Sequence, residues 1–152
     1  MRPLLQIASK LRRFCWWLVR PITRGVRAII VNGMGQILLV RHNYVEGWFL
    51  PGGAVAQNED YEMALRRELE EELGITDISS VSKLGEYQNT YEYKLDTIVV
   101  FEVGSFAREE KQHFEIERWG FFDPCALPEG VSPGTRRRVE EWLGQRESSN
   151  EW

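Results

Sequence analysis

The chain of 152 residues contains little cysteine, and its N-terminal segment has no apolar run long enough to span a membrane. Cys15 and Cys125 are too few for a disulfide framework and form no CxxC or Cys/His pattern. A zinc site is therefore not expected, and a reducing compartment, the cytoplasm, is favoured. The longest apolar run of the first 24 residues is 14–19, whereas a spanning helix needs about 20 residues. This run is also too short for a secretory signal.

Acidic residues outnumber basic ones outside the N-terminal segment, by 23 to 13. Residues 1–24 contain six Lys and Arg residues and no acid, a charge of +6, so the net charge of −4 leaves −10 for residues 25–152. An acidic body argues against nonspecific binding of nucleic acid through a broad basic face, and no DNA partner is expected. Anionic substrates are not excluded, because a bound metal ion can reverse the local sign of the charge.

Residues 1–24 are predicted to form a basic amphipathic helix. Their apolar residues recur at helical spacing until Pro21 ends the pattern. We expect the apolar face to pack on the domain or on a second subunit. Packing on a second subunit would make the protein a homodimer. Contact of residues 1–20 with a membrane surface is the less favoured alternative, suggested by the mixture of basic residues with Trp and Phe.

The remainder, residues 25–146, is expected to form one domain, followed by a tail at 147–152 that frays. Asn32-Gly33 predicts a hairpin that pairs strands at 26–31 and 36–41. A second strand pair is expected at 81–92 and 95–103, a last strand at 119–122, and helices at 60–73 and 133–144. This order lacks regular βαβ alternation, so the fold class is α/β of the α+β type, with a mixed β-sheet between α-helices.

Three glutamates are expected to share one face of the first helix of this domain. Glu68, Glu71 and Glu72 stand at positions i, i+3 and i+4, so their carboxylates would repel one another without a counter-charge. Hard oxygen ligands without nearby His or Cys suit Mg²⁺, or Mn²⁺, and Mg²⁺ is usually shared with substrate phosphates. The alternative is that the acidic run is an ordinary solvated helix face.

The residues around this run resemble the Nudix box at all nine of its specified positions, between residues 53 and 75. The matching residues are Gly53, Glu59, Arg67, Glu68, Leu69, Glu71, Glu72, Gly74 and Ile75. The resemblance implies a Nudix fold and Mg²⁺-dependent hydrolysis of a nucleoside diphosphate linked to another moiety. Such substrates include nucleoside triphosphates, dinucleoside polyphosphates, ADP-ribose and nucleotide sugars. Ala56 stands where many members have glutamate, so a second metal site would be weaker or differently arranged.

The resemblance also implies roles for particular residues. Glu68, Glu71 and Glu72 would be the metal ligands, and Arg67 would orient the glutamates through charge-assisted hydrogen bonds. The general base is open between Glu115, in a later loop, and Glu68.

Other residues are candidates for binding the substrate, each with a structural alternative. Tyr91 and Tyr93 could stack on a base, although packing along a strand explains them equally well. Arg41 could meet a phosphate, although a surface arginine is the more ordinary interpretation. Gly52 and Gly53 are expected to form a tight turn into the helix beside the phosphates.

Two further functions are considered. A Nudix-fold module could bind a nucleotide for regulation without cleaving it, but the intact glutamate triad favours catalysis. Pyrophosphohydrolysis at an RNA 5′ end would use the same chemistry. It is supported only by the basic N-terminal segment and by Arg136-Arg137-Arg138, which could instead face solvent or pair with Glu140 and Glu141.

Overall fold

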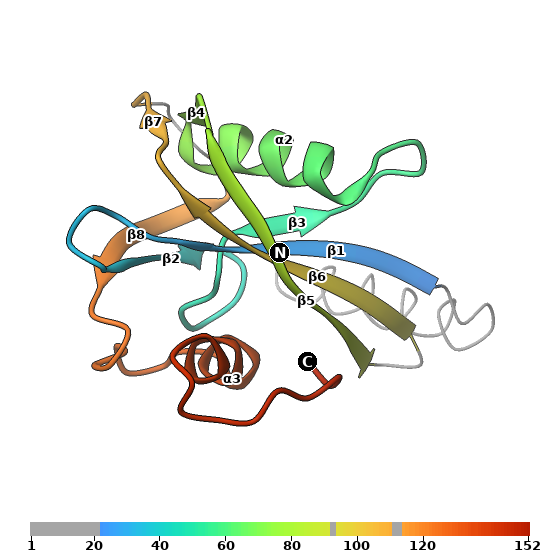
Figure 1. The fold of residues 1–152 in the computed structure, drawn as a ribbon. Coiled ribbons are helices and arrows are strands. Elements are labelled where there is room, and N and C mark those ends of the chain that lie inside the picture. Colours follow the sequence, from blue (N-terminus) through green and yellow to red (C-terminus); the bar gives the residue numbers. More distant parts are fainter. Residues whose placement is uncertain (1–21, 92–93, 111–113) are drawn as a thin grey trace, which may run out of the picture.

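The computed structural model describes residues 22–91, 94–110 and 114–152 (Figure 1). The predicted N-terminal helix, up to residue 21, and Tyr93 lie outside the described residues. The elements are β1 (Ile22–Ile30), β2 (Ile37–His42), β3 (Gly52–Ala54), α2 (Tyr61–Leu73), β4 (Ile75–Thr76), β5 (Ser80–Tyr91), β6 (Lys94–Gly104), β7 (Ala107–Arg108), β8 (Ile116–Phe122) and α3 (Pro133–Trp142). No helix within the described ranges is long and apolar enough to cross a membrane.

A mixed four-stranded sheet forms the centre of the fold. Its strand order is β3-β1-β6-β5; β1 and β6 are parallel, and the other neighbours are antiparallel. Figure 1 shows α2 on one side of this sheet and α3 on the other. The expected mixed sheet between helices is therefore confirmed, and so is the predicted pairing of the strands now seen as β5 and β6.

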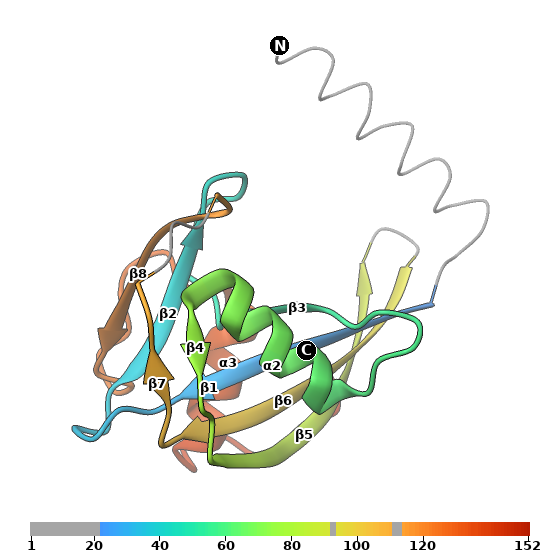
Figure 2. The same ribbon diagram turned by 90° about the horizontal axis from the view of Figure 1, so that it is seen from above.

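The predicted hairpin between the first two strands is wrong. The turn itself forms, because the Asn32 side-chain oxygen accepts hydrogen bonds from the backbone N–H groups of Met34 and Gln36. Beyond a single bridge between Val31 and Ile37, however, the two strands separate. Both edges of β1 are already occupied by β3 and β6, so β2 pairs instead with β8. Figure 2 shows this second pair beside the central sheet.

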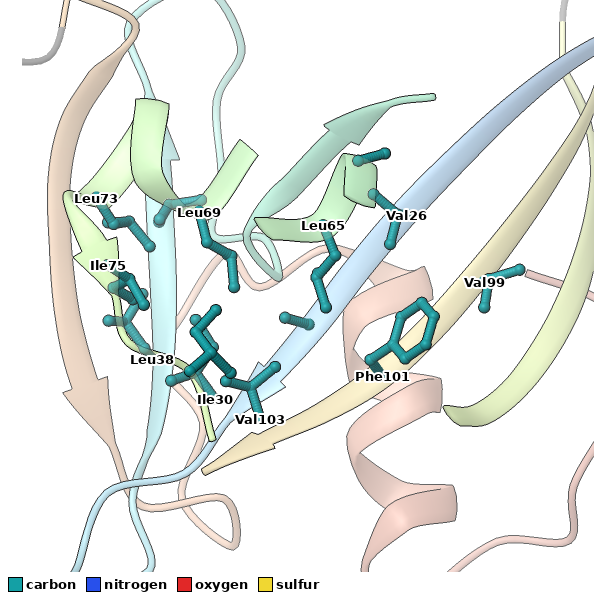
Figure 3. Packing of buried hydrophobic residues seen from close by; sticks show 14 residues of the cluster. Val26, Ile30, Leu38, Leu65, Leu69, Leu73, Ile75, Val99, Phe101 and Val103 are labelled. Carbon is teal, nitrogen blue, oxygen red and sulfur yellow. The ribbon is translucent and has the colours of Figure 1, made fainter. Parts of the chain in front are cut away.

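The helix α2 is fixed to the sheet by an apolar stripe. Leu65, Leu69 and Leu73 recur every fourth residue and are fully buried; Figure 3 shows Leu65 and Leu69 over the central sheet and Leu73 beside Ile75 and Leu38. Each such leucine contributes roughly 1.5–3 kcal/mol relative to an exposed side chain. Because this stripe sets the rotation of the helix, it also sets the direction of the glutamates between the leucines.

Both ends of α2 have a specific cap. Asp60 is the N-cap, and its carboxylate accepts a hydrogen bond from Met63 N at 2.8 Å. Gly74 ends the helix in the left-handed conformation, with φ 64°. Glu59, the residue before this N-cap, accepts a hydrogen bond from Ala56 N–H and contacts Arg67.

The C-terminal tail differs from the expectation that it frays. Gln88 in β5 donates its N–H to the Asn150 carbonyl at 2.7 Å, and Trp152 N–H donates to the Gln88 carbonyl at 2.9 Å. The Trp152 ring lies 6.2 Å from that of Tyr87 and fills the space beside Gly134 in α3. The free backbone edge of β5 and one large aromatic side chain together hold a tail that its polar composition marked as loose.

Candidate active site

A cavity of about 400 Å³ opens where β1, β3, α2 and the end of β2 meet. Glu68 and Glu72 of α2 line it together with Glu115, the residue before β8. Asn43 N–H, just beyond β2, donates to the Glu115 carbonyl at 3.1 Å and so holds this acid at the cavity. The structure thus brings two box glutamates and the candidate base from the later loop into one space.

Glu72 is the buried acid of the cavity, with 7% of its surface exposed. Its Oε2 accepts a hydrogen bond from Gly52 N–H at 3.1 Å. Burial raises the pKa of Glu72 to about 7, and the nearby Glu68 and Glu115 carboxylates act in the same direction. The Gly52 hydrogen bond and the Arg27 charge oppose this rise without cancelling it. A carboxylate held in this way gains from any cation that approaches it.

Arg67 connects the start of the box to its glutamates. Its Nε and Nη2 contact the two oxygens of Glu59 at 2.6 and 2.9 Å, and its Nη1 lies 2.8 Å from Glu68 Oε1 and 3.2 Å from Glu71 Oε2. Nη2 also donates to the Ala54 carbonyl at 3.0 Å. These contacts hold the Glu68 carboxylate in one orientation beside β3. The predicted pairing of Arg67 with Glu71 is present.

Glu71 is placed differently from the other two predicted metal ligands. Its side chain is 61% exposed, and it does not line the cavity that Glu68 and Glu72 share. In the described ranges, no three Asp, Glu, His or Cys side chains are gathered closely enough to enclose a metal ion. The structure therefore brings together two of the three expected ligands, and the third lies on the solvent side of the same helix.

Gly52 and Gly53 line the cavity, but they do so as part of a strand rather than as the expected turn. Gly52 has φ 141°, and a Cβ there would lie 2.1 Å from the Val26 carbonyl oxygen. A Cβ at Gly53 would lie 2.3 Å from the Glu68 carboxyl carbon. The two glycines allow β3 to lie close to both β1 and the acidic side of α2.

The cavity also contains residues that the sequence did not single out. Arg27 lines it from β1, and His42 and Tyr44 line it from the end of β2. Burial lowers the pKa of His42, with the Arg27 charge acting in the same direction, and the His42 ring stacks on Tyr44 at 5.0 Å. The signal for Arg27 was present in the sequence, because it is a charged residue inside the apolar run 26–31.

Among the remaining substrate-binding candidates, Arg41 has a described side chain, and it does not line this cavity. Arg41 pairs with Glu117 at 3.2 Å and lines a separate hollow of about 200 Å³, which agrees with the surface-arginine alternative. Tyr91 ends β5, but its side chain, like all of Tyr93, lies outside what the structure describes. Base stacking by these tyrosines stays a prediction.

Comparisons with known proteins agree with this fold and cavity. The model of the NUDIX domain family matches residues 21–143. The chain is 44% identical over 130 residues to the "Putative 8-oxo-dGTP diphosphatase" of Bacillus subtilis (strain 168), which covers 84% of this chain and 85% of the relative. It is 31% identical over 128 residues to the RNA pyrophosphohydrolase of Acidiphilium cryptum (strain JF-5), covering 80% of this chain and 74% of that protein.

Solved structures give the same result. The MutT NUDIX hydrolase from Burkholderia pseudomallei superposes with a TM-score of 0.69 at 29% identity, covering 78% of this chain and 96% of that one. The MutT protein from Methanosarcina mazei Go1 gives 0.70 at 25% identity, covering 83% and 95%. The fold and the family match define a hydrolase that acts on diphosphate linkages in nucleotides. The chain belongs to the Nudix hydrolase family.

Proposed function

We propose that this enzyme hydrolyses a nucleoside triphosphate to the monophosphate and pyrophosphate with Mg²⁺ as cofactor, and that it does so in the cytoplasm. The observation that carries the proposal is the shared cavity, in which the carboxylates of Glu68, Glu72 and Glu115 lie with the Arg27 guanidinium. The choice of a triphosphate rests on the relatives named as 8-oxo-dGTP diphosphatases in Bacillus subtilis and Haemophilus influenzae. Mn²⁺ is the alternative metal.

The donor set of the cavity fits a hard divalent cation. Its acidic groups offer only oxygen, the ligand type that Mg²⁺ prefers, and among the described residues the Arg27 charge offsets only part of the cost of burying the Glu72 carboxylate. Glu68 and Glu72 would hold the ion, and Glu71 would join them after turning from its present position beside Arg67. When bound, the ion would neutralise phosphate charge and lower the pKa of the attacking water.

The side chains of the cavity divide the remaining work. Arg67 donates to Glu68 Oε1 at 2.8 Å, which fixes that carboxylate in one orientation for binding the metal. Glu115 is exposed at the cavity and is therefore our candidate for the general base that takes a proton from the attacking water. Gly52 N–H keeps Glu72 directed toward β3.

The test is a substrate panel assayed with Mg²⁺, containing nucleoside triphosphates, 8-oxo-dGTP, ADP-ribose, nucleotide sugars and dinucleoside polyphosphates. We expect turnover of a triphosphate that is abolished by EDTA and by Glu72→Gln. The matched control is Glu70→Gln, which removes an exposed acid of the same helix that does not line the cavity. Saturable nucleotide binding without turnover would instead identify a regulatory binding module.

The assignment of the base has its own experiment. Glu115→Gln should lower kcat by at least about 10²-fold, with the loss concentrated in the limb of the pH–rate profile that reports the base. Glu117→Gln is the matched control, because Glu117 pairs with Arg41 outside this cavity. Near-normal turnover by the Glu115 variant would transfer the role to Glu68.

RNA 5′-end hydrolysis is the second candidate, and the relatives named RNA pyrophosphohydrolase favour it. The arginine run on α3 gives it little support. Arg138 is buried and pairs with Glu141 at 2.9 Å, and Arg137 contacts the carbonyl of Trp152, so Arg136 is the exposed member of the run. Release of pyrophosphate from triphosphorylated RNA, at a kcat/KM above that for free nucleotides, would favour the RNA function.

A further inference from the structure

Two partly buried arginines of β1, Arg24 and Arg27, line the cavity, and neither is a proposed metal ligand or the proposed base. Arg27 stands in β1, the strand that has β3 on one edge and β6 on the other. Its register partners are Gly52 and Val100, so its backbone is fixed from both sides. Along a strand, alternate residues share a face, and Thr23, Gly25 and Arg27 line the cavity together with the neighbouring Arg24. Arg27 therefore enters the cavity from a rigid element.

The guanidinium of Arg27 is only partly used by the protein. Within the described residues its hydrogen bond is from Nη1 to the neighbouring Val26 carbonyl, at 2.9 Å. A guanidinium has five N–H donors in a planar fork, which matches the oxygens of phosphate, and it stays protonated in proteins. Burial lowers the pKa of Arg27, and the nearby Glu72 carboxylate raises it. Such a half-buried cation is costly unless another anion comes to it.

Arg24, on the same strand, differs from Arg27 because its guanidinium contacts other parts of the protein. The Arg24 Nη2 donates to the Ala56 carbonyl at 2.8 Å, and its guanidinium carbon lies 5.6 Å from the centre of the Tyr61 ring. Arg24 thereby connects β1 to the loop before α2. Arg27 makes no comparable connection to a distant part of the described chain, and its remaining N–H groups are available to a ligand.

We propose that Arg27 binds non-bridging oxygens of the substrate's phosphate groups from the β1 side of the cavity. The inference rests on the proposed function, since it concerns the same site. The proposal adds a phosphate contact outside the box, from a charged residue that stands between the buried Val26 and Ala28. The glutamates attract the metal, and Arg27 supplies positive charge that does not depend on the metal.

The first arm of the test is steady-state kinetics on the preferred triphosphate. Arg27→Met keeps the aliphatic stem and removes the fork, and we expect kcat/KM to fall by about 10- to 100-fold, mainly through KM. Arg27→Lys keeps the charge and should give an intermediate value. Arg66→Met removes a cation from the exposed side of α2, where Arg66 pairs with Glu62, and should change KM less than about 3-fold.

The second arm is calorimetric binding of magnesium pyrophosphate, which needs no turnover. Wild type should bind it saturably, and Arg27→Met should bind it at least about 10-fold more weakly. Melting curves establish that each variant is folded, and Arg27→Lys replaces the methionine variant if that one is not. Wild-type KM and wild-type pyrophosphate affinity in the Arg27 variants would overturn the proposal. Arg27-dependent pyrophosphate binding without turnover of any substrate would support Arg27 while overturning the hydrolysis proposed above.

Discussion

Glu59 and Glu72, near opposite ends of the helix α2, have the same side chain, but the protein shifts their pKa values in opposite directions. Glu59, just before α2, has both oxygens in contact with Arg67 and also accepts a hydrogen bond from Ala56 N–H at 3.0 Å. The hydrogen bond from Arg67 is the largest cause, the one from Ala56 N–H adds to it, and the pKa of Glu59 is lowered to about 2. Glu72, in the last turn of α2, is buried with one backbone hydrogen bond, and burial raises its pKa to about 7.

The difference separates a structural end of the helix from a functional one. At Glu59 the protein supplies its own cation, so the carboxylate is stable as an anion and holds the loop to the helix. At Glu72 the protein buries an acid without a full counter-charge, an arrangement that disfavours the metal-free folded state. Environments that move the pKa values of like groups apart are typical of active sites. The variants below test whether the two ends really differ in this way.

The largest expected effect is on turnover by Glu72→Gln. If this carboxylate holds the metal, its loss removes several kcal/mol of transition-state stabilisation, which corresponds to about 10³-fold in kcat. Glu59→Gln should cost far less, because Glu59 does not line the cavity. The measurement is kcat at saturating Mg²⁺ and substrate for both variants. Equal losses would remove the distinction between the two ends.

The next effect is on stability without metal. The folded-state pKa of Glu72, about 7, lies above its unfolded value of 4.5, so the protonated form is favoured in the folded protein. Wild type should therefore lose stability as the pH rises from 4.5 to about 7, by roughly 3 kcal/mol. Glu72→Gln lacks this loss and keeps an oxygen for Gly52 N–H, so in EDTA it should be the more stable protein at pH 8.

Urea unfolding in EDTA at pH 4 and pH 8 gives the required comparison. The free energies of unfolding of wild type and Glu72→Gln should agree at pH 4 and separate at pH 8. Mg²⁺ at pH 8 should restore stability to wild type only, since binding to the folded state adds stability. Parallel pH curves for the two proteins would show that Glu72 is not a strained acid.

The sequence predicts this helix well because its signals are local. The predicted helix at 60–73 rests on residues within a few turns of one another, and the structure contains it as Tyr61–Leu73, with Arg67 one turn before Glu71. The mixed sheet between helices also followed from the order of elements. The helix period placed Glu71 with Glu68, but it could not decide which of the two would turn toward Arg67 and solvent and which would line the cavity.

The features that the sequence did not predict depend on distant partners. Asn32-Gly33 specifies a turn, but the pairing of β1 is decided by β3 and β6, which come later in the chain. Arg27 belongs to the site only because α2 and the end of β2, which follow β1 in the chain, pack beside it. The anchoring of Trp152 likewise requires Tyr87 of β5. These contacts join residues far apart in sequence, and no local pattern contains them.

A smaller expected effect concerns Arg67, the residue that connects the two ends. Arg67→Met removes the hydrogen bonds to Glu59, Glu68 and the Ala54 carbonyl, so we expect a loss of about 2 kcal/mol in the free energy of unfolding. Lys83→Met is the control, because Lys83 makes an exposed pair with Glu86, and its loss should cost less than about 1 kcal/mol. Equal losses in urea unfolding would mean that the Arg67 network is no stronger than a surface pair.

The smallest effect is expected for the stability of Glu59→Gln, and its pH dependence should be opposite in sign to that of Glu72→Gln. The folded-state pKa of Glu59, about 2, lies below the ordinary 4.5, so its contribution to stability is present above pH 4.5 and is lost as the pH falls toward 2. The variant should therefore melt slightly below wild type at pH 7, and the two melting temperatures should converge in acid. Because an ion pair with Arg67 holds Glu59, raising the salt concentration should also narrow the gap between the two melting temperatures. A gap that widens in acid would mean that Glu59, like Glu72, is held against its preferred charge, and the two ends of the helix would then be alike.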